Sequence, residues 1–530
     1  MSTRSRKKGM NIMEYTFRFL DDELFFGGST IKGTSQPYDA TTEEEYDFTA
    51  SCPNQTMPLF LSTKGRYLYS PSPFKIRFSA GVITVVGEDV RMVTAGECLR
   101  DAYLMAMREH FPFDGHRLPE RFFTTAQYNT WMEFTYYPTQ EGVLRYAHAI
   151  VDNGFTPGIL IIDEGWHGRY GEWEFDFARF PDPKAMVDEL HRLGFTVMLW
   201  VVPAVCPDGH DFICSIIKAL GGGEDYDKVY IRNKEGRPGL FFWWNGYSAL
   251  LDMRKESDRR FLKTRLDRLV SEYGVDGFKF DGGTVGMYHP SNMVNGTPRD
   301  DHDPHAMNIA WNEFGRAYEY HEFKDSYHCG GRNTIQRLCD RGHVWEGDGI
   351  NTLLPCAIVQ GLTGHPFLCP DMIGGGQWTY AKDPSFAVDE ELFVRMAEAS
   401  ALMPMMQFSW APWRALSPQS LALVRRAAEL HRRLAPEILA LVREAEVGGE
   451  PVLRSLEYND PHKGYGRVMD EFMLGTDILV APVLGKGATE REVVFPEGTW
   501  RSEDGRVYSG NATHRVAAPL GSLPWFRREK

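Results

Sequence analysis

Acidic side chains follow four short apolar runs that have the composition of buried β-strands. The four acids, each with the residues before it, are Asp163 (Ile-Leu-Ile-Ile), Asp281 (Gly-Phe-Lys-Phe), Asp348 (His-Val-Trp-Glu-Gly) and Asp371 (Pro-Phe-Leu-Cys-Pro). A single Asp in such a place is more often the N-cap of the next helix, by roughly two to one. Four of them at the ends of parallel strands indicate instead a ring of carboxylates on one rim of a sheet.

A ring of carboxylates is suited to two kinds of chemistry. The absence of a His cluster in the sequence disfavours zinc, whereas Mg²⁺ binds oxygen ligands and stays an alternative. Cleavage of a glycosidic bond with retained configuration needs two carboxyl groups about 5 Å apart, one as nucleophile and one as proton donor. A cation such as Lys279 or Arg332 would keep the nucleophile ionised. The donor needs a raised pKa, and further carboxylates can bind sugar hydroxyls.

Tryptophans are frequent in the same part of the chain. Their rings can stack on the apolar faces of sugars, although each one alone is more typical of a hydrophobic core. The eight that we consider as walls of a sugar site are Trp131, Trp166, Trp243, Trp244, Trp345, Trp378, Trp410 and Trp413.

From about residue 120, short apolar runs alternate with amphipathic segments, which is the pattern of βα units. The predicted strands are 125–131, 158–162, 197–202, 277–281, 326–329, 343–345, 366–369 and 405–408, and the clearest predicted helices are 140–153, 184–193 and 258–273. Eight strands with interleaved helices predict an α/β fold of the (β/α)₈ TIM-barrel type. An open doubly wound sheet is the alternative, but it would carry a Gly-rich phosphate turn after its first strand, and the sequence has none there.

The flanking regions differ from the barrel pattern. Residues 1–13 are predicted to be a disordered tail, 14–118 an N-terminal β-sandwich, 119–416 the barrel, and 417–530 a helical connection followed by a C-terminal β-domain. These boundaries follow from runs of β-forming residues separated by Gly, Pro, Asn and Ser on either side of the barrel.

The composition restricts the partners that we expect. A net charge of −14 argues against nucleic acid. The basic N-terminus has no apolar segment behind it, and no apolar run has the length of a membrane helix, so we expect neither a secretory signal nor a membrane partner. The eight cysteines form no Cys-x-x-Cys pair and are expected to be free thiols in the cytoplasm. We expect no cofactor and no metal; the sequence leaves a homo-oligomer open.

Several of these segments resemble glycoside hydrolase family 31, from about Tyr128 to the C-terminus. Phe-Lys-Phe-Asp281-Gly-Gly is similar to the family's nucleophile strand, and Val-Trp-Glu-Gly-Asp348 is similar to its acid/base segment. The resemblance implies a retaining mechanism on an oligosaccharide or other α-glycoside, with Asp281 as nucleophile and Asp348 as general acid/base. It also implies a substrate-binding set, which is Asp163, Glu164, Trp166, Trp243, Lys279, Arg332, Trp345, Asp371 and Trp410.

Departures from the family pattern bear on the sugar. Pro412 stands near the place where the family's glucosidases carry a His, which favours a branch that resembles α-galactosidases. Glu164 stands where that branch often has a second Asp, and Thr284 stands where some relatives have an acid. The alternatives are an α-glucosidase, an α-xylosidase, a sulfoquinovosidase or a transglycosylase of the same family, and a catalytically silent carbohydrate-binding protein.

Overall fold

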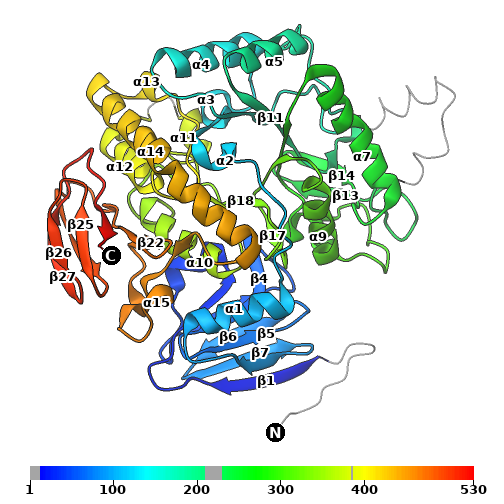
Figure 1. Ribbon diagram of the computed structural model, residues 1–530. Coiled ribbons are helices and arrows are strands. Elements are labelled where there is room, and N and C mark those ends of the chain that lie inside the picture. The colour runs from blue at the N-terminus through cyan, green and yellow to red at the C-terminus, as the bar shows by residue number, and fades with distance from the viewer. Residues whose placement is uncertain (1–11, 209–228, 384–385, 530) are drawn as a thin grey trace. The chain divides into compact units, whose positions relative to one another are not determined.

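A computed structural model of the protein describes residues 12–208, 229–383 and 386–529 (Figure 1). Residues 1–11 of the predicted tail and Cys214 lie outside these ranges, and the first strand, β1, begins at Met13. The chain divides into two compact units. The first unit comprises Gln127–Tyr327 and Ser409–Ala411; the second unit comprises Met1–Ala126, His328–Phe408 and Pro412–Lys530.

A parallel sheet forms the core of the first unit. Its strands follow the order β9 (Gln127–Asn129), β10 (Ile159–Ile162), β11 (Thr196–Val201), β15 (Gly277–Phe280) and β16 (Tyr320–Phe323). All residues of β10 and β15 are buried, as expected for parallel strands that are covered on both faces. The predicted second, third and fourth strands are therefore confirmed. The first is shorter than predicted, because Trp131 already begins a helix.

Helices alternate with these strands. They are α3 (Trp131–Phe134), α4 (Gln140–Asp152), α5 (Pro183–Arg192), α7 (Glu256–Arg268), α8 (Val285–Tyr288) and α9 (Pro304–Gly315), and a π-helical segment, Leu269–Tyr273, continues α7. The ends of α5 show why the sequence specifies it. The Asp182 side chain accepts a hydrogen bond from the Ala185 amide, and Pro183 occupies the first turn. Gly194, at φ +96°, then ends the segment.

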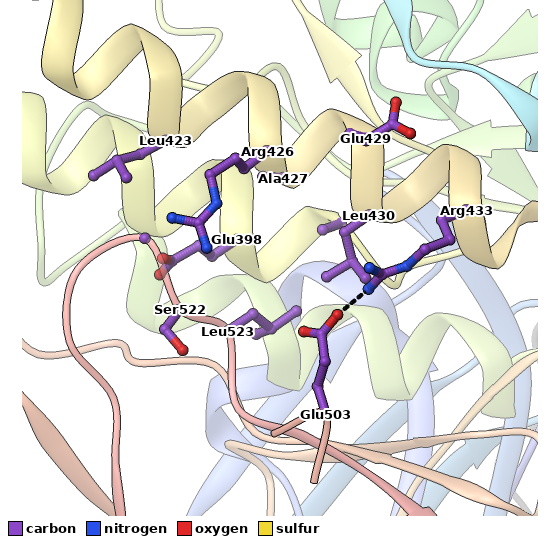
Figure 2. A pocket seen from close by; sticks show the side chains of 12 residues that line it. Glu398, Leu423, Arg426, Ala427, Glu429, Leu430, Arg433, Glu503, Ser522 and Leu523 are labelled. Atoms are coloured by element: carbon purple, nitrogen blue, oxygen red, sulfur yellow. Dashed lines mark hydrogen bonds and ion pairs between the residues drawn. The ribbon is translucent and has the colours of Figure 1, made fainter. Parts of the chain in front are cut away.

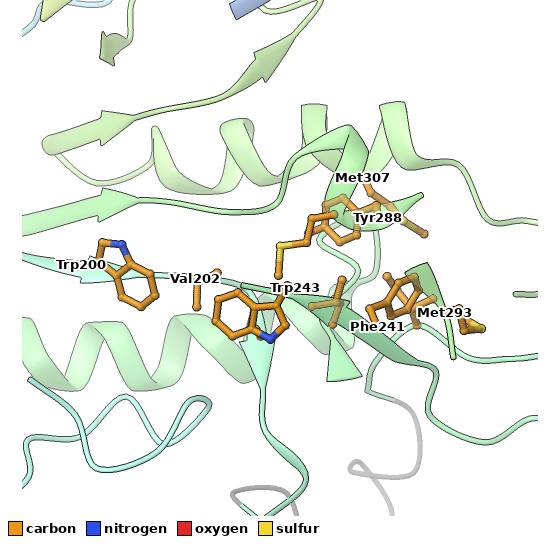
Figure 3. Close-up of a cluster of buried hydrophobic side chains, with 11 residues drawn as sticks. Trp200, Val202, Phe241, Trp243, Tyr288, Met293 and Met307 are labelled. Carbon is orange, nitrogen blue, oxygen red and sulfur yellow. The ribbon is translucent and has the colours of Figure 1, made fainter. Parts of the chain in front are cut away.

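An antiparallel hairpin projects from the first unit. Its strands are β13 (Leu240–Trp243) and β14 (Gly246–Leu250), and β14 also pairs with β12 (Ala204–Val205). One face of the hairpin packs into a buried cluster that contains Trp200, Phe241 and Trp243 (Figure 3). This packing fixes the hairpin on the strand β11 from which Trp200 comes.

The second unit contributes three further strands. β18 (Ile335–Arg337) is parallel to β19 (Leu368–Cys369), and Ile373 bridges to Phe408 at the end of β20 (Gln407–Phe408). With the five of the first unit this gives eight strands, the number of a (β/α)₈ barrel. The associated helices are α10 (Leu353–Leu362), α11 (Thr379–Lys382), α12 (Glu390–Ser400), α13 (Pro412–Ala415) and α14 (Pro418–Gly448).

The predicted fifth and sixth strands are wrong. Ser326–Tyr327 is a two-residue strand, β17, outside the parallel series, whose fifth strand is β16. His343–Trp345 contains no strand, and β18 precedes it. Both true strands carry buried polar residues, among them Glu322 in β16 and Arg337 in β18. A prediction based on apolar runs does not detect strands that contain polar residues.

Antiparallel sheets make up the rest of the second unit. Near the N-terminus, one sheet has the order β1-β7-β6-β3, and in another β4 pairs with β2 and β5, and β5 with β8. Their bounds are β1 Met13–Arg18, β2 Phe25–Ser29, β3 Glu44–Asp47, β4 Gln55–Ser62, β5 Arg66–Tyr69, β6 Lys75–Ser79, β7 Val82–Gly87 and β8 Arg91–Thr94. Two helices that were not predicted follow, α1 (Leu99–His110) and the short α2 (Arg121–Thr124).

The C-terminal β-domain has a six-stranded sheet, β21-β22-β23-β28-β25-β26, and a two-stranded sheet, β24-β27. The bounds are β21 Leu453–Arg454, β22 Phe472–Leu474, β23 Ile478–Val480, β24 Glu490–Phe495, β25 Thr499–Ser502, β26 Val507–Ser509, β27 Ala512–Ala517 and β28 Trp525–Arg528, with α15 at Leu456–Asn459. Among the helices in the described ranges, none has the length and apolar character needed to cross a membrane.

Candidate active site

An ion pair lies at the end of strands β10 and β15. The Lys279 ammonium donates to Asp163 Oδ2 over 2.6 Å, and each side chain is 3% exposed. Asn129, at the end of β9, donates to the same oxygen over 2.7 Å. Lys279 therefore neutralises Asp163, whereas from the sequence we expected it to support the nucleophile.

Asp281 follows β15 directly and is only partly buried. The indole N–H of Trp200 donates to its Oδ2 over 3.0 Å, and the Gly282 amide donates to its Oδ1 over 2.8 Å. Both hydrogen bonds stabilise the charged carboxylate and fix its direction. Trp200 was not among the predicted site residues, because it lies in the middle of the predicted strand 197–202, where a Trp is typical of a core.

Two glycines allow the chain to turn after Asp281. Gly282 and Gly283 have φ values of +59° and +61°. A Cβ on Gly282 would lie 2.5 Å from Val202 Cγ2, and one on Gly283 would lie 2.4 Å from Trp311 Cδ1. The Gly-Gly pair is thus needed both for its backbone angles and for close packing.

Glu164 is the centre of a buried polar cluster near Asp163 and Asp281. Its Oε1 accepts hydrogen bonds from the Tyr170 hydroxyl, at 2.5 Å, and from the Asn245 amide, which also donates to Tyr170. The pKa of Glu164 is raised to about 8, mainly by burial and in part by the charges of Asp163 and Asp281, whereas the Tyr170 hydrogen bond and the Lys279 charge oppose the shift. A carboxyl group with this pKa is largely protonated at pH 7 and can donate a hydrogen bond.

Within the second unit, Asp371 holds a buried network. Its Oδ1 accepts from Arg337 over 2.7 Å, and its Oδ2 accepts from the Arg341 and Gly376 amides over 2.6 and 3.0 Å. Arg337 also donates to Asp340. Burial raises the pKa of Asp371, which the Arg337 guanidinium opposes. Three protein donors thus engage Asp371; its role in binding a sugar stays a prediction.

Asp348 lies in a loop of the second unit and is exposed. It does not end a strand, because β18 already stops at Arg337. In the same loop, the indole N–H of Trp345 donates to Asp389 over 3.1 Å. Arg332 precedes β18, and its guanidinium lies 3.7 Å from Cys329 Sγ. Exposure leaves the Asp348 carboxyl accessible to a substrate, as a proton donor requires.

Half of the eight predicted tryptophan walls are core residues. The buried four are Trp131, Trp166, Trp243 and Trp410. The indole N–H of Trp166 donates to the Trp200 carbonyl over 2.8 Å, so Trp166 helps to hold the backbone of the residue that contacts Asp281. Trp244 is half exposed and lies next to Trp243, with ring centroids 4.8 Å apart.

Two cavities lie away from these acids. One, of about 200 Å³, is in the second unit and is lined by Glu398, Arg426, Arg433 and neighbouring residues (Figure 2). The other, of about 670 Å³, runs between α7 and α9 of the first unit. Neither is lined by a residue of the predicted site.

Among the described residues, no three His, Cys, Asp or Glu side chains are grouped so as to hold a metal ion. The described cysteines are free thiols, as predicted. The described part of the chain thus adds no donor set to the carboxylates already named.

Known proteins are similar to this chain in sequence and in fold. The model of the glycosyl hydrolases family 31 TIM-barrel domain matches residues 118–441, and that of the family's C-terminal domain matches residues 449–530. The myogenesis-regulating glycosidase of Mus musculus is 32% identical over 424 residues, which cover 78% of this chain and 57% of that protein. Alpha-glucosidase 2 of Bacillus thermoamyloliquefaciens is 25% identical over 422 residues, which cover 74% of this chain and 51% of that protein.

A solved structure has the same overall fold. A family 31 dextranase from Flavobacterium johnsoniae, solved with isomaltotriose, superimposes with a TM-score of 0.81 over 99% of this chain and 68% of that one, at 18% identity. The chain spans about half the length of the curated relatives it matches. The predicted barrel with flanking β-domains is confirmed, and the chain belongs to glycosyl hydrolase family 31.

Proposed function

We propose that the protein is a retaining α-glycoside hydrolase that acts on terminal α-linked sugars. The observation that carries the proposal is the geometry of Asp281, a partly exposed carboxylate at a strand end whose two oxygens are held by Trp200 and Gly282. A nucleophile has to be ionised, aimed and accessible; the two hydrogen bonds favour ionisation and orientation, and partial exposure leaves the carboxylate accessible.

The reaction is a double displacement. Asp281 attacks the anomeric carbon while Asp348 protonates the departing oxygen, and a glycosyl-enzyme with inverted configuration forms. Asp348, now a carboxylate, takes a proton from water, which attacks the same carbon. The bond to Asp281 breaks and the α-configuration is restored.

The remaining polar groups of the first unit are suited to bind the hydroxyls of the sugar. Asp163, paired with Lys279, offers an acceptor, and Glu164 in its protonated form offers a donor. Because both are buried, hydrogen bonds to them are formed out of water, where a missing partner is costly. Such a pair discriminates between sugars that differ in the direction of one hydroxyl.

We infer that the sugar is α-galactose. Pro412 in place of the His expected in a glucosidase supports this choice. An α-glucoside is the second candidate, since relatives are named alpha-glucosidase and 1,3-alpha-isomaltosidase.

A panel of 4-nitrophenyl α-glycosides (galacto, gluco, xylo and N-acetylgalacto) tests the proposal, with Asp281→Ala as control. Release from one member, lost in the variant and retained in EDTA, is the expected result and names the sugar. Loss of activity in EDTA would point to the Mg²⁺ alternative. Binding of a glycoside without release from any member would point to a carbohydrate-binding protein.

A further inference from the structure

The hairpin β13–β14 has two unlike faces. Phe241 and Trp243 are buried in the cluster of Figure 3. On the other face, Phe242, Trp244 and Tyr247 are 54%, 50% and 54% exposed. Phe242 and Tyr247 are direct partners across the two strands, with ring centroids 5.5 Å apart. We call these three residues the aromatic strip.

The strip is anchored at the polar cluster of the candidate active site. Asn245, in the turn of the hairpin, donates to Glu164 and to Tyr170. A Cβ on Gly282 would lie 3.5 Å from Cη2 of Trp244, so the edge of this indole lies against the residue that follows Asp281. The strip therefore begins beside the nucleophile and continues along the hairpin.

The hairpin that carries the aromatic strip is fixed by its buried residue Trp243. The indole N–H of Trp243 donates to Ser248 Oγ over 2.9 Å, and its ring packs edge-on against Tyr170 at 5.1 Å. Large apolar side chains that gather on one exposed face mark an interaction site more often than single exposed residues do. A hairpin whose other face is already packed loses little conformational entropy in its backbone when a ligand stacks on the exposed face.

On the basis of the proposed function, we propose that the aromatic strip binds the sugar units on the leaving-group side of the cleaved bond. The groups suited to the attacked sugar, Asp163, Glu164 and Lys279, are buried and polar, whereas the strip is exposed and apolar. Pyranose rings have C–H faces that stack on aromatic rings. A strip that starts at Gly282 and extends away from the acids fits an oligosaccharide whose terminal sugar sits at Asp281.

Comparison of two kinds of substrate isolates this role. Glycosyl fluorides have no ring on the leaving-group side, so they report on the site around Asp281 alone. We would measure kcat/KM for α-galactosyl and α-glucosyl fluoride, and for raffinose and isomaltotriose, which end in the same two sugars. The variants are Phe242→Ala/Tyr247→Ala and, to keep apolar bulk while losing the flat rings, Phe242→Leu/Tyr247→Leu.

The ratio of kcat/KM for the trisaccharide to that for the fluoride should fall about three- to tenfold in both double variants, mainly through KM. Phe177→Ala is the matched control, because Phe177 is also 54% exposed in the same unit, and it should keep the parent ratio. An unchanged ratio in both double variants would overturn the proposal.

A binding measurement separates this inference from the proposed function. Calorimetry with the Asp281→Ala protein and each trisaccharide should show weaker binding when the strip is also changed. A parent that hydrolyses neither fluoride and no member of the nitrophenyl panel would refute the proposed function, and the calorimetric comparison would still decide whether the strip binds sugar. A strip variant that instead changes the oligomeric state, with equal sugar affinity, would show that the face binds a second copy.

Discussion

Two buried glutamates have similarly raised pKa values in different surroundings. Glu164 lies near Asp281, and Glu471 lies in the C-terminal β-domain. Burial raises the pKa of Glu164 to about 8, and it raises the pKa of Glu471 to about 8 as well. Glu471 lies 3.4 Å from Arg491 and accepts from the Val494 amide over 2.9 Å, and one acid, Asp470, adds to the rise in its pKa. Glu164 accepts from Tyr170 and Asn245, and two acids, Asp163 and Asp281, add to the rise in its pKa, which Lys279 opposes.

The comparison shows that a raised pKa alone does not identify a functional group. Desolvation is the largest cause of the raised pKa in both places, although Glu471 lies in the β-domain and away from the acids of the candidate active site. What distinguishes the candidate active site is the gathering of several acids next to a partly exposed one. Substitutions in one region therefore have matched controls in the other.

The largest expected effect is on catalysis. Asp281→Ala should lower kcat at least about a thousandfold, since it removes the group that we propose as the nucleophile. Its thermal unfolding should change little. Glu471→Gln should keep the parent kcat, and a comparable loss of activity in this variant would break the distinction between the two regions. Added azide should partly restore turnover of Asp281→Ala by forming a β-glycosyl azide.

The next effect is on stability at pH 7. Lys279→Met leaves Asp163 buried without its cation, which should lower the free energy of unfolding by about 3–5 kcal/mol. Arg491→Met should cost less, about 1–3 kcal/mol, because Glu471 can remain protonated at this pH. Urea denaturation of both variants tests the difference. The double variant Asp163→Asn/Lys279→Met should recover part of the loss, and equal losses at the two sites would contradict this expectation.

A third prediction concerns pH. The folded-state pKa of each glutamate, about 8, lies above its ordinary value of 4.5. The stabilisation that belongs to the protonated form is therefore complete below pH 4.5 and is lost as the pH rises through about 8. Relative to the parent, Glu164→Gln and Glu471→Gln should each gain stability over this range, by up to a few kcal/mol.

The two substitutions should differ in their effect on activity. Glu164→Gln should alter the pH dependence of KM near pH 8, because we propose Glu164 as a sugar-binding residue, whereas Glu471→Gln should not. Unfolding measured at intervals of pH gives the stability part, and Michaelis profiles at the same pH values give the functional part.

The smallest expected effect comes from Trp200→Phe. This change removes the 3.0 Å hydrogen bond to Asp281 Oδ2 and keeps most of the ring volume. Loss of one hydrogen bond to a charged group predicts a roughly five- to tenfold fall in kcat. Trp500→Phe is the counterpart in the β-domain, where the indole N–H donates to the Pro496 carbonyl, and it should leave kcat unchanged.

The sequence by itself determined the strands whose side chains are apolar and the helices with clear ends. β10 and β15 are runs of buried residues, and α5 carries its own cap and stop, so local patterns specify them. Because an acid directly follows each of these two strands, the sequence alone also predicted that Asp163 and Asp281 lie on the same rim of the parallel sheet.

Only the tertiary structure decided which polar residues are inside. β16 and β18 bury Glu322 and Arg337, which no apolar pattern reveals. Trp166 is also buried, although a Trp at this position could have been an exposed platform for a sugar. Glu164 and Asp281 each have one partner from a distant segment of the chain, Asn245 for Glu164 and Trp200 for Asp281. Burial and hydrogen bonding depend on which segments meet in space, and the local sequence does not specify these contacts between distant segments.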